Sequence, residues 1–219
     1  MKPIRRTFIA ASIMAALLAP AGPVLAQHAG HVAVIQPRAA AKVAETGAVL
    51  RDLWVGHIFW VRNVVTDTLA GNKAGAAAAE QEVVANARAI ADSIGPFYGE
   101  AASDKLFGLL AGHYGAVKQY LEATAAGSAS RQDAAVKNLT GNAADIARFL
   151  SGANPNLPFD TLNGLMLAHG GHHIQEIEQI KNRQYAQEAQ TWEAMKRHMY
   201  VIADALVNAI ASQFPARFS

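Results

Sequence analysis

The sequence predicts an all-α protein, a helical bundle of about six helices built from three repeated αα-hairpins. Apolar residues recur at three- and four-residue spacing from residue 38 to Phe218, and no segment alternates as a strand would. Breaks rich in glycine, proline and polar residues divide this region into six helices. The helices pair into hairpins that repeat every 56 residues, and this repeat predicts a pseudo-threefold arrangement around one core.

The first 26 residues have the features of a secretory signal peptide. Lys2, Arg5 and Arg6 form a basic start, an apolar run follows, and Val24-Leu25-Ala26 supplies a cleavage site of small residues. Within it, "RRTFIA" resembles the twin-arginine export signal, and an ordinary leader with two arginines is the alternative. We therefore expect a periplasmic or secreted protein. No later run is apolar enough for a transmembrane segment.

After the leader we expect a flexible tail over residues 27–37 and a single helical-bundle domain over residues 38–219. The first hairpin is expected at 38–94, with helices 38–70 and 76–94 separated by "AGNKAG". The second, at 101–151, follows "IGPFYG" and has helices 101–126 and 131–151 separated by "AAGSAS". The third, at 159–213, follows "SGANPNLP" and has helices 159–182 and 187–213 separated by "KNRQ".

Charge and cysteine content exclude several classes of function. The formal net charge of the whole chain is +2, and removing the three basic residues of the leader leaves it close to neutral. A surface without a basic surplus gives no support for nucleic-acid binding. The chain has no cysteine, which excludes disulfides, thiolate metal sites and iron–sulfur clusters. Any metal ion must therefore bind imidazole, carboxylate, amide or thioether groups.

The repeat brings one histidine of each hairpin into register. His57, His113 and His169 correspond, as do Leu53, Leu109 and Leu165 just before them. If the hairpins close into a ring, the three imidazoles approach a common axis, whereas a linear stack would keep them apart. Three short hairpins favour the closed ring.

The simplest interpretation of these histidines is structural. Each lies 29 residues before a polar position on the second helix of its hairpin, which is Asn86, Asn142 or His198. A cross-hairpin hydrogen bond would satisfy both side chains without any ligand.

The third hairpin favours a metal site instead. His173 stands where the other hairpins have Val61 and Val117, and Glu176 stands where they have Val64 and Tyr120. His169 and His173 are four residues apart and share a helix face, a spacing at which two imidazoles can bind one ion. The predicted metal ligands are His57, His113, His169 and His173, with Glu176 and His198 as further ligands or supporting groups.

Nitrogen-rich ligation without thiolate favours copper or zinc over iron, and over magnesium or calcium. Met166, Met195 and Met199 all lie in the third hairpin; thioethers there would suit copper, although methionine more often fills gaps in a core. Gly170 and Gly171 interrupt a helical sequence. They would either let neighbouring helices approach near the histidines or kink the helix.

Three segments carry a resemblance to a known family. They are "LWVGHIFWVRNVV" at 53–65, "PFYGEAASDKLFGLLAGHYGAVKQYL" at 96–121 and "NAADIARFLSGANP" at 142–155. They are similar to an uncharacterised bacterial family of small all-helical proteins with a Leu-Trp-x-x-His-x-x-Trp-x-Arg signature, a Phe-Tyr-Gly turn and a later Leu-x-x-His. The resemblance implies the helical fold and implies no function. The family positions are Leu53, Trp54, His57, Trp60, Arg62, Phe97, Tyr98, Gly99 and His113.

Three functions remain open from the sequence. The leading hypothesis is a periplasmic metal-binding protein with a histidine-rich site inside the bundle. The second is an enzyme that uses the metal ion, an oxidoreductase or a hydrolase. The third is a helical module that binds haem or a small ligand through the aromatic residues Trp54, Phe59, Trp60, Tyr114 and Tyr120.

Overall fold

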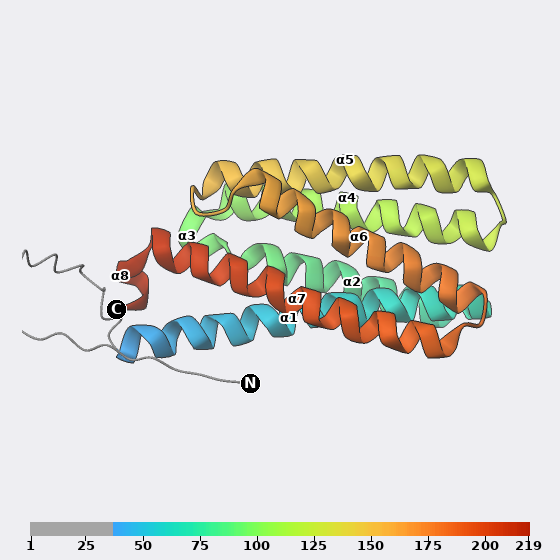
Figure 1. Ribbon diagram of the computed structural model, residues 1–219, viewed down its shortest axis with the longest axis horizontal. Coiled ribbons are helices and arrows are strands. Elements are labelled where there is room, and N and C mark those ends of the chain that lie inside the picture. The colour runs from blue at the N-terminus through green and yellow to red at the C-terminus, as the bar shows by residue number, and fades with distance from the viewer. Residues whose placement is uncertain (1–36) are drawn as a thin grey trace, which may run out of the picture. The chain divides into compact units, whose positions relative to one another are not determined.

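The computed structural model describes residues 37–219, and the regular structure of this part of the chain is helical (Figure 1). The expected leader at 1–26 and the expected tail as far as residue 36 lie outside the described residues. Six helices are long, and their bounds are α1 Pro37–Ala70, α2 Lys73–Asp92, α4 Glu100–Ala125, α5 Ala129–Ala153, α6 Phe159–Lys181 and α7 Tyr185–Gln213. Two more, α3 Gly95–Tyr98 and α8 Pro215–Phe218, are single turns.

The helix bounds differ from the expected ones mainly at the breaks. Helix α2 begins at Lys73 rather than at residue 76, because the side chain of Asn72 caps it by accepting a hydrogen bond from the Gly75 amide at 3.1 Å. The "PFY" segment, expected as part of a break, forms α3 because proline is well placed in a first helical turn. Gly99, with φ of 87°, then separates α3 from α4.

The turns inside the three hairpins share one backbone conformation. A residue with positive φ follows the first helix of each hairpin, and these residues are Gly71, Gly127 and Arg183. At each turn two backbone amides bond back to the preceding helix with the same spacing, as in Gly71 N to Thr68 O and Asn72 N to Asp67 O. This is the Schellman ending of a helix, which favours glycine at the left-handed position. Arg183 occupies it in the third hairpin.

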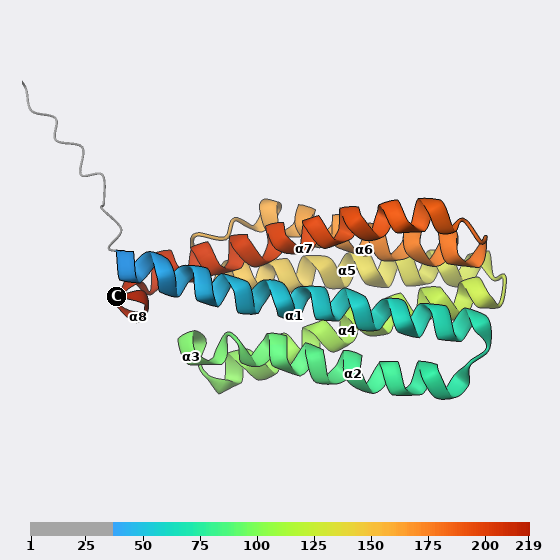
Figure 2. The same cartoon turned by 90° about the horizontal axis from the view of Figure 1, so that it is seen from below.

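The six long helices contact one another in a closed order (Figures 1 and 2). Along the chain, α1 packs on α2, α2 on α4, α4 on α5, α5 on α6 and α6 on α7, and α7 returns to pack on α1. The first helices of the three hairpins, α1, α4 and α6, also contact one another. The predicted helical bundle is therefore confirmed, while the triplication of one 56-residue unit stays a prediction.

Two apolar clusters form the core, and His57 of α1, His113 of α4 and His169 and His173 of α6 lie where they meet along these helices. On α6, Met166 belongs to the first cluster and Ile177 to the second, with His169 and His173 between them in the helix. The other two methionines of the third hairpin, Met195 and Met199, are buried in the first cluster, as the interpretation of methionine as a core residue expects. Within residues 37–219, no helix combines the length and the apolar character needed to cross a membrane.

Candidate metal centre

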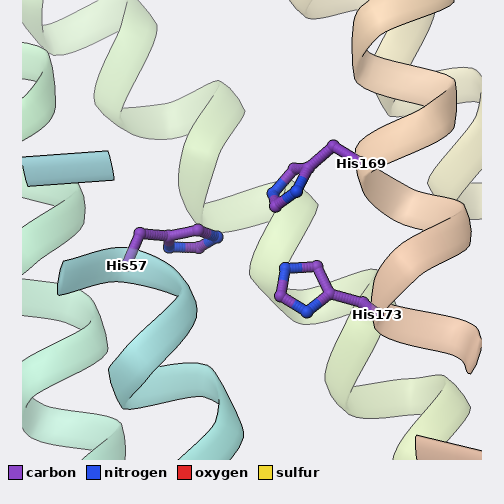
Figure 3. Close-up of side chains that lie close together, drawn as sticks. All are labelled: His57, His169 and His173. Carbon is purple, nitrogen blue, oxygen red and sulfur yellow. The ribbon is translucent and has the colours of Figure 1, made fainter. Parts of the chain in front are cut away.

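Three buried histidines from two helices face one another in the bundle core (Figure 3). Helix α1 supplies His57, and α6 supplies His169 and His173 from consecutive turns of one face. One ring nitrogen of each lies within 4.8 Å of the others. His169 and His173 are fully buried and His57 is 6% exposed. This group, called the triad below, can hold a metal ion.

The spacing of the triad rings suits coordination of one ion. An ion–nitrogen bond of about 2.1 Å and a tetrahedral angle place the centres of two coordinated imidazole rings about 5.2 Å apart. The ring centres of His169 and His173 are 4.5 Å apart, and those of His57 lie 5.5 Å from His169 and 5.7 Å from His173. The three separations bracket the value for coordination, so small rotations of the side chains would bring the nitrogens onto an ion.

His113 on α4 borders the triad and has a fixed ring orientation. Its ring centre is 5.3 Å from that of His169 and 6.5 Å from those of His57 and His173. Its Nδ1 lies 3.2 Å from Oδ1 of Asn142, an acceptor, so Nδ1 carries the proton. The lone pair of His113 is therefore on Nε2, which is buried without a hydrogen-bond partner.

Unpaired polar atoms are concentrated at this place in the core. Both nitrogens of His169 and of His173, Nε2 of His113 and both carboxyl oxygens of Glu176 are buried without a hydrogen-bond partner among residues 37–219. A buried donor or acceptor left unpaired costs about 1–3 kcal/mol, so this cluster lowers the stability of the folded protein when no ligand is bound. A bound cation would satisfy the imidazole lone pairs.

Burial keeps the imidazoles neutral, the form that binds metal ions. Burial lowers the pKa of His173 to about 4. The pKa of His113 falls to about 3, chiefly through burial and then through repulsion from His173, against the hydrogen bond to Asn142. Burial, followed by repulsion from His173, lowers the pKa of His57 and of His169 well below the usual 6.5. Near neutral pH an incoming cation therefore meets no positive charge on these rings.

Glu176 lies at the edge of the triad and connects it to two charged residues. Its Oε2 is 3.8 Å from Nδ1 of His173, and its Oε1 is 3.8 Å from Nε of Arg62. Both distances are too long for hydrogen bonds. Burial and the nearby Glu188 raise the pKa of Glu176 to about 8, although Arg62 acts in the opposite direction. A carboxyl group beside a ring nitrogen can orient that ring when the other nitrogen binds a metal ion.

His198, predicted as a ligand, lies away from the triad. Its Nε2 is 2.8 Å from the carbonyl oxygen of Leu165, to which it must donate. Its ring lies nearest to His172, with ring centres 5.3 Å apart. Asn86 and Asn142 occupy the same position in the other hairpins and make the same hydrogen bond, to the carbonyl oxygens of Leu53 and Leu109, both at 3.0 Å.

The structural interpretation of the histidines holds for one hairpin. The expected bond between the histidine and the asparagine is present for His113 and Asn142. In the first hairpin, Oδ1 of Asn86 is buried without a partner, so Asn86 does not bond to His57. In the third, His169 has no partner on either nitrogen.

The glycines near the histidines lie at close contacts between helices. Gly56 and Gly112 lie where the two helices of one hairpin meet, and Gly170 lies where α6 meets α5. A Cβ on Gly56 or Gly112 would lie 3.0 or 3.1 Å from the Nδ2 of Asn86 or Asn142, so glycine makes room for the bonds of these asparagines. A Cβ on Gly170 would lie 3.0 Å from Leu139 of α5, whereas Gly171 has open space. The expectation of close approach is thus met at Gly170 and not at Gly171, and the contact is with α5 and not with another histidine-bearing helix.

Two charged residues near the site were not found from the sequence. Arg62 donates two hydrogen bonds to the buried Glu188, at 2.6 and 2.9 Å, and so holds a guanidinium close to Glu176. Arg62 had appeared only as a family position. Glu188 lies in the first turn of α7, where an acidic residue normally indicates a favourable helix terminus, so no sequence signal marked it as part of the core.

No protein-family model, no curated protein and no solved structure matches this sequence. The resemblance of the three sequence segments to a bacterial family stays an expectation.

Proposed function

We propose that the protein binds one transition-metal ion, copper or zinc, through His57, His169 and His173, and that it does so in the periplasm. The observation that carries the proposal is the convergence of three buried, neutral imidazoles whose nitrogens lie within 4.8 Å of one another. Imidazole ligands without thiolate suit these two ions better than magnesium or calcium. The periplasmic location is supported by the leader-like residues 1–26.

His113 is the residue that distinguishes a binding site from a catalytic one. Structural zinc sites use four protein ligands, whereas catalytic sites use three and leave a position for water or substrate. With Nδ1 held by Asn142, His113 presents Nε2 as a fourth donor. We infer that His113 completes a four-imidazole site, which favours metal binding over the oxidoreductase or hydrolase alternative. Five shallow surface clefts in the described part of the chain are lined by residues other than the triad histidines.

We also infer that the three hairpins are copies of one 56-residue unit. The hydrogen bonds of Asn86, Asn142 and His198 to a carbonyl 33 residues earlier support this. The positive-φ residues Gly71, Gly127 and Arg183, spaced at the same interval, give independent support. Such a unit explains why single histidines from separate hairpins reach one place.

Metal analysis of the protein tests the proposal. The chain, made without a histidine tag and exported by its own leader, is purified and its copper and zinc are measured. We expect about one tightly bound ion per chain, lost in the double variant His169→Ala/His173→Ala. The matched control is His172→Ala, on the same helix and outside the triad, which should keep that ion. A wild-type protein that stays below about a tenth of an equivalent after metal supplementation contradicts the proposal.

A further inference from the structure

A second pair of histidines lies across the third hairpin, outside the triad. His172 is on α6 and His198 on α7, both half-buried, with ring centres 5.3 Å apart and ring planes at 61°. Two imidazoles bound to one tetrahedral ion have centres about 5.2 Å apart. The pair therefore has the separation that a shared ion requires before any ion is bound.

The free nitrogens of this pair follow from its hydrogen bonds. His198 donates from Nε2 to the carbonyl oxygen of Leu165 at 2.8 Å, so its lone pair is on Nδ1. This bond also fixes the orientation of the ring. Nδ1 of His172 is buried without a hydrogen-bond partner among the described residues. Each ring thus offers a nitrogen that the fold leaves unused.

The structural task of His198 does not require histidine. In the other two hairpins asparagine makes the same bond to a carbonyl 33 residues earlier, from Asn86 to Leu53 and from Asn142 to Leu109. Asparagine has no nitrogen with a lone pair for a metal ion, and histidine has one. Histidine at position 198 therefore adds a donor beyond what the hairpin needs.

We propose that His172 and His198, both half-buried, form a second site for a divalent transition-metal ion, Zn²⁺ or Cu²⁺. Two protein nitrogens hold the ion and water molecules complete its coordination. With two imidazoles instead of three or four, the site should bind at least about tenfold more weakly than the triad. Because its ligands are not triad residues, this proposal does not depend on the triad binding a metal ion.

Calorimetric titration of the metal-free full chain with Zn²⁺ tests the second site. We expect the wild type to bind two equivalents with separable affinities, and His198→Asn to bind only the tighter one. Asparagine there restores the bond of the other hairpins, so the variant should unfold at the same temperature as the wild type. His172→Ala should also lose the weaker equivalent. In His57→Ala/His169→Ala, the weaker equivalent alone should remain.

Two results would overturn the second site. One is a wild-type protein that binds no ion beyond the triad equivalent. The other is a weaker equivalent that survives in both His198→Asn and His172→Ala, because it would then belong elsewhere, for instance to His28 and His31 near the N-terminus. Loss of the tighter equivalent alone bears only on the triad, so failure of one proposal is distinguishable from failure of the other.

Discussion

Replacing His169 by leucine should stabilise the metal-free protein. His169 is fully buried, and neither of its nitrogens has a hydrogen-bond partner. Each unpaired buried group costs about 1–3 kcal/mol, so removing both recovers roughly 2–6 kcal/mol. Leucine fits an imidazole-shaped space imperfectly, at a cost of about 1–3 kcal/mol. We therefore expect the free energy of unfolding of metal-free His169→Leu to rise by about 1–3 kcal/mol.

The same substitution should abolish the stabilisation by metal. Zinc at 1,000 times its dissociation constant stabilises a single-site protein by about 4.1 kcal/mol, which exceeds the expected advantage of the variant. Urea denaturation with a chelator and then with zinc should therefore show the variant more stable in the first condition and less stable in the second. His113→Leu is the comparison. It removes one unpaired nitrogen but leaves Oδ1 of Asn142 without its donor, so only the misfit remains, a loss of about 1–3 kcal/mol.

The opposite result would refute the reasoning. If metal-free His169→Leu is less stable than the wild type by more than about 1 kcal/mol, the imidazole is paired in solution and its role is structural.

The remaining predictions concern pH, the hairpin turn and the paired glycines. Because the folded pKa of Glu176 is raised from 4.5 to about 8, its contribution to stability is full below pH 4.5 and is lost as pH rises through 8. Between pH 6.5 and 7.5 this carboxyl group by itself lowers the free energy of unfolding of the metal-free protein by about 1.2 kcal/mol, whereas the buried histidines raise it, because their pKa values are lowered and their unfolded forms still lose protons in this range. Because the histidine contribution is common to both proteins, the free energy of unfolding of the wild type should fall relative to that of Glu176→Gln by about 1 kcal/mol between the two pH values in denaturant titrations. Arg183→Gly, which relieves a φ of 58°, should raise the melting temperature by about 2–4 °C, and an unchanged or lower value would show that the turn is not strained. Gly171→Ala, with open space around the added Cβ, should raise the free energy of unfolding by about 1 kcal/mol. Gly170→Ala should raise it less, because its Cβ presses on Leu139. Equal increases in melting temperature for the two variants would contradict the close packing of α6 on α5.

The helices could be predicted from the sequence because their causes are local. Apolar spacing and the glycines at left-handed positions each act within a few residues. The Asn72 cap is also local, but it was missed, so the start of α2 was expected three residues too late. The meeting of His57 with His169 and His173 is a long-range feature. It was nevertheless expected, because the proposed 56-residue register places one histidine of each hairpin at an equivalent position.

Which histidines make hydrogen bonds within a hairpin, and which face one another unpaired, could not be predicted from the sequence. The 29-residue spacing predicted the same bond for His57 with Asn86 and for His113 with Asn142, and only the second forms. The sequence position of His198 makes it as good a ligand candidate as the other histidines. In the structure its ring donates to the Leu165 carbonyl and lies beside His172. Such outcomes depend on ring orientation and on distances of a few tenths of an ångström, which only the packed structure determines.

The third hairpin explains why a metal site is the stronger interpretation of this core. Val61 and Val117 are buried at the positions that correspond to His173, and Val64 and Tyr120 are buried at those that correspond to Glu176. Valine at 173 would therefore extend the second apolar cluster without loss of a hydrogen bond, since both nitrogens of His173 are unpaired. A buried imidazole and a buried carboxyl group lower the stability of the empty protein there. The presence of His173 and Glu176 in the core is explained if a metal ion binds the histidines and so pairs with their free ring nitrogens.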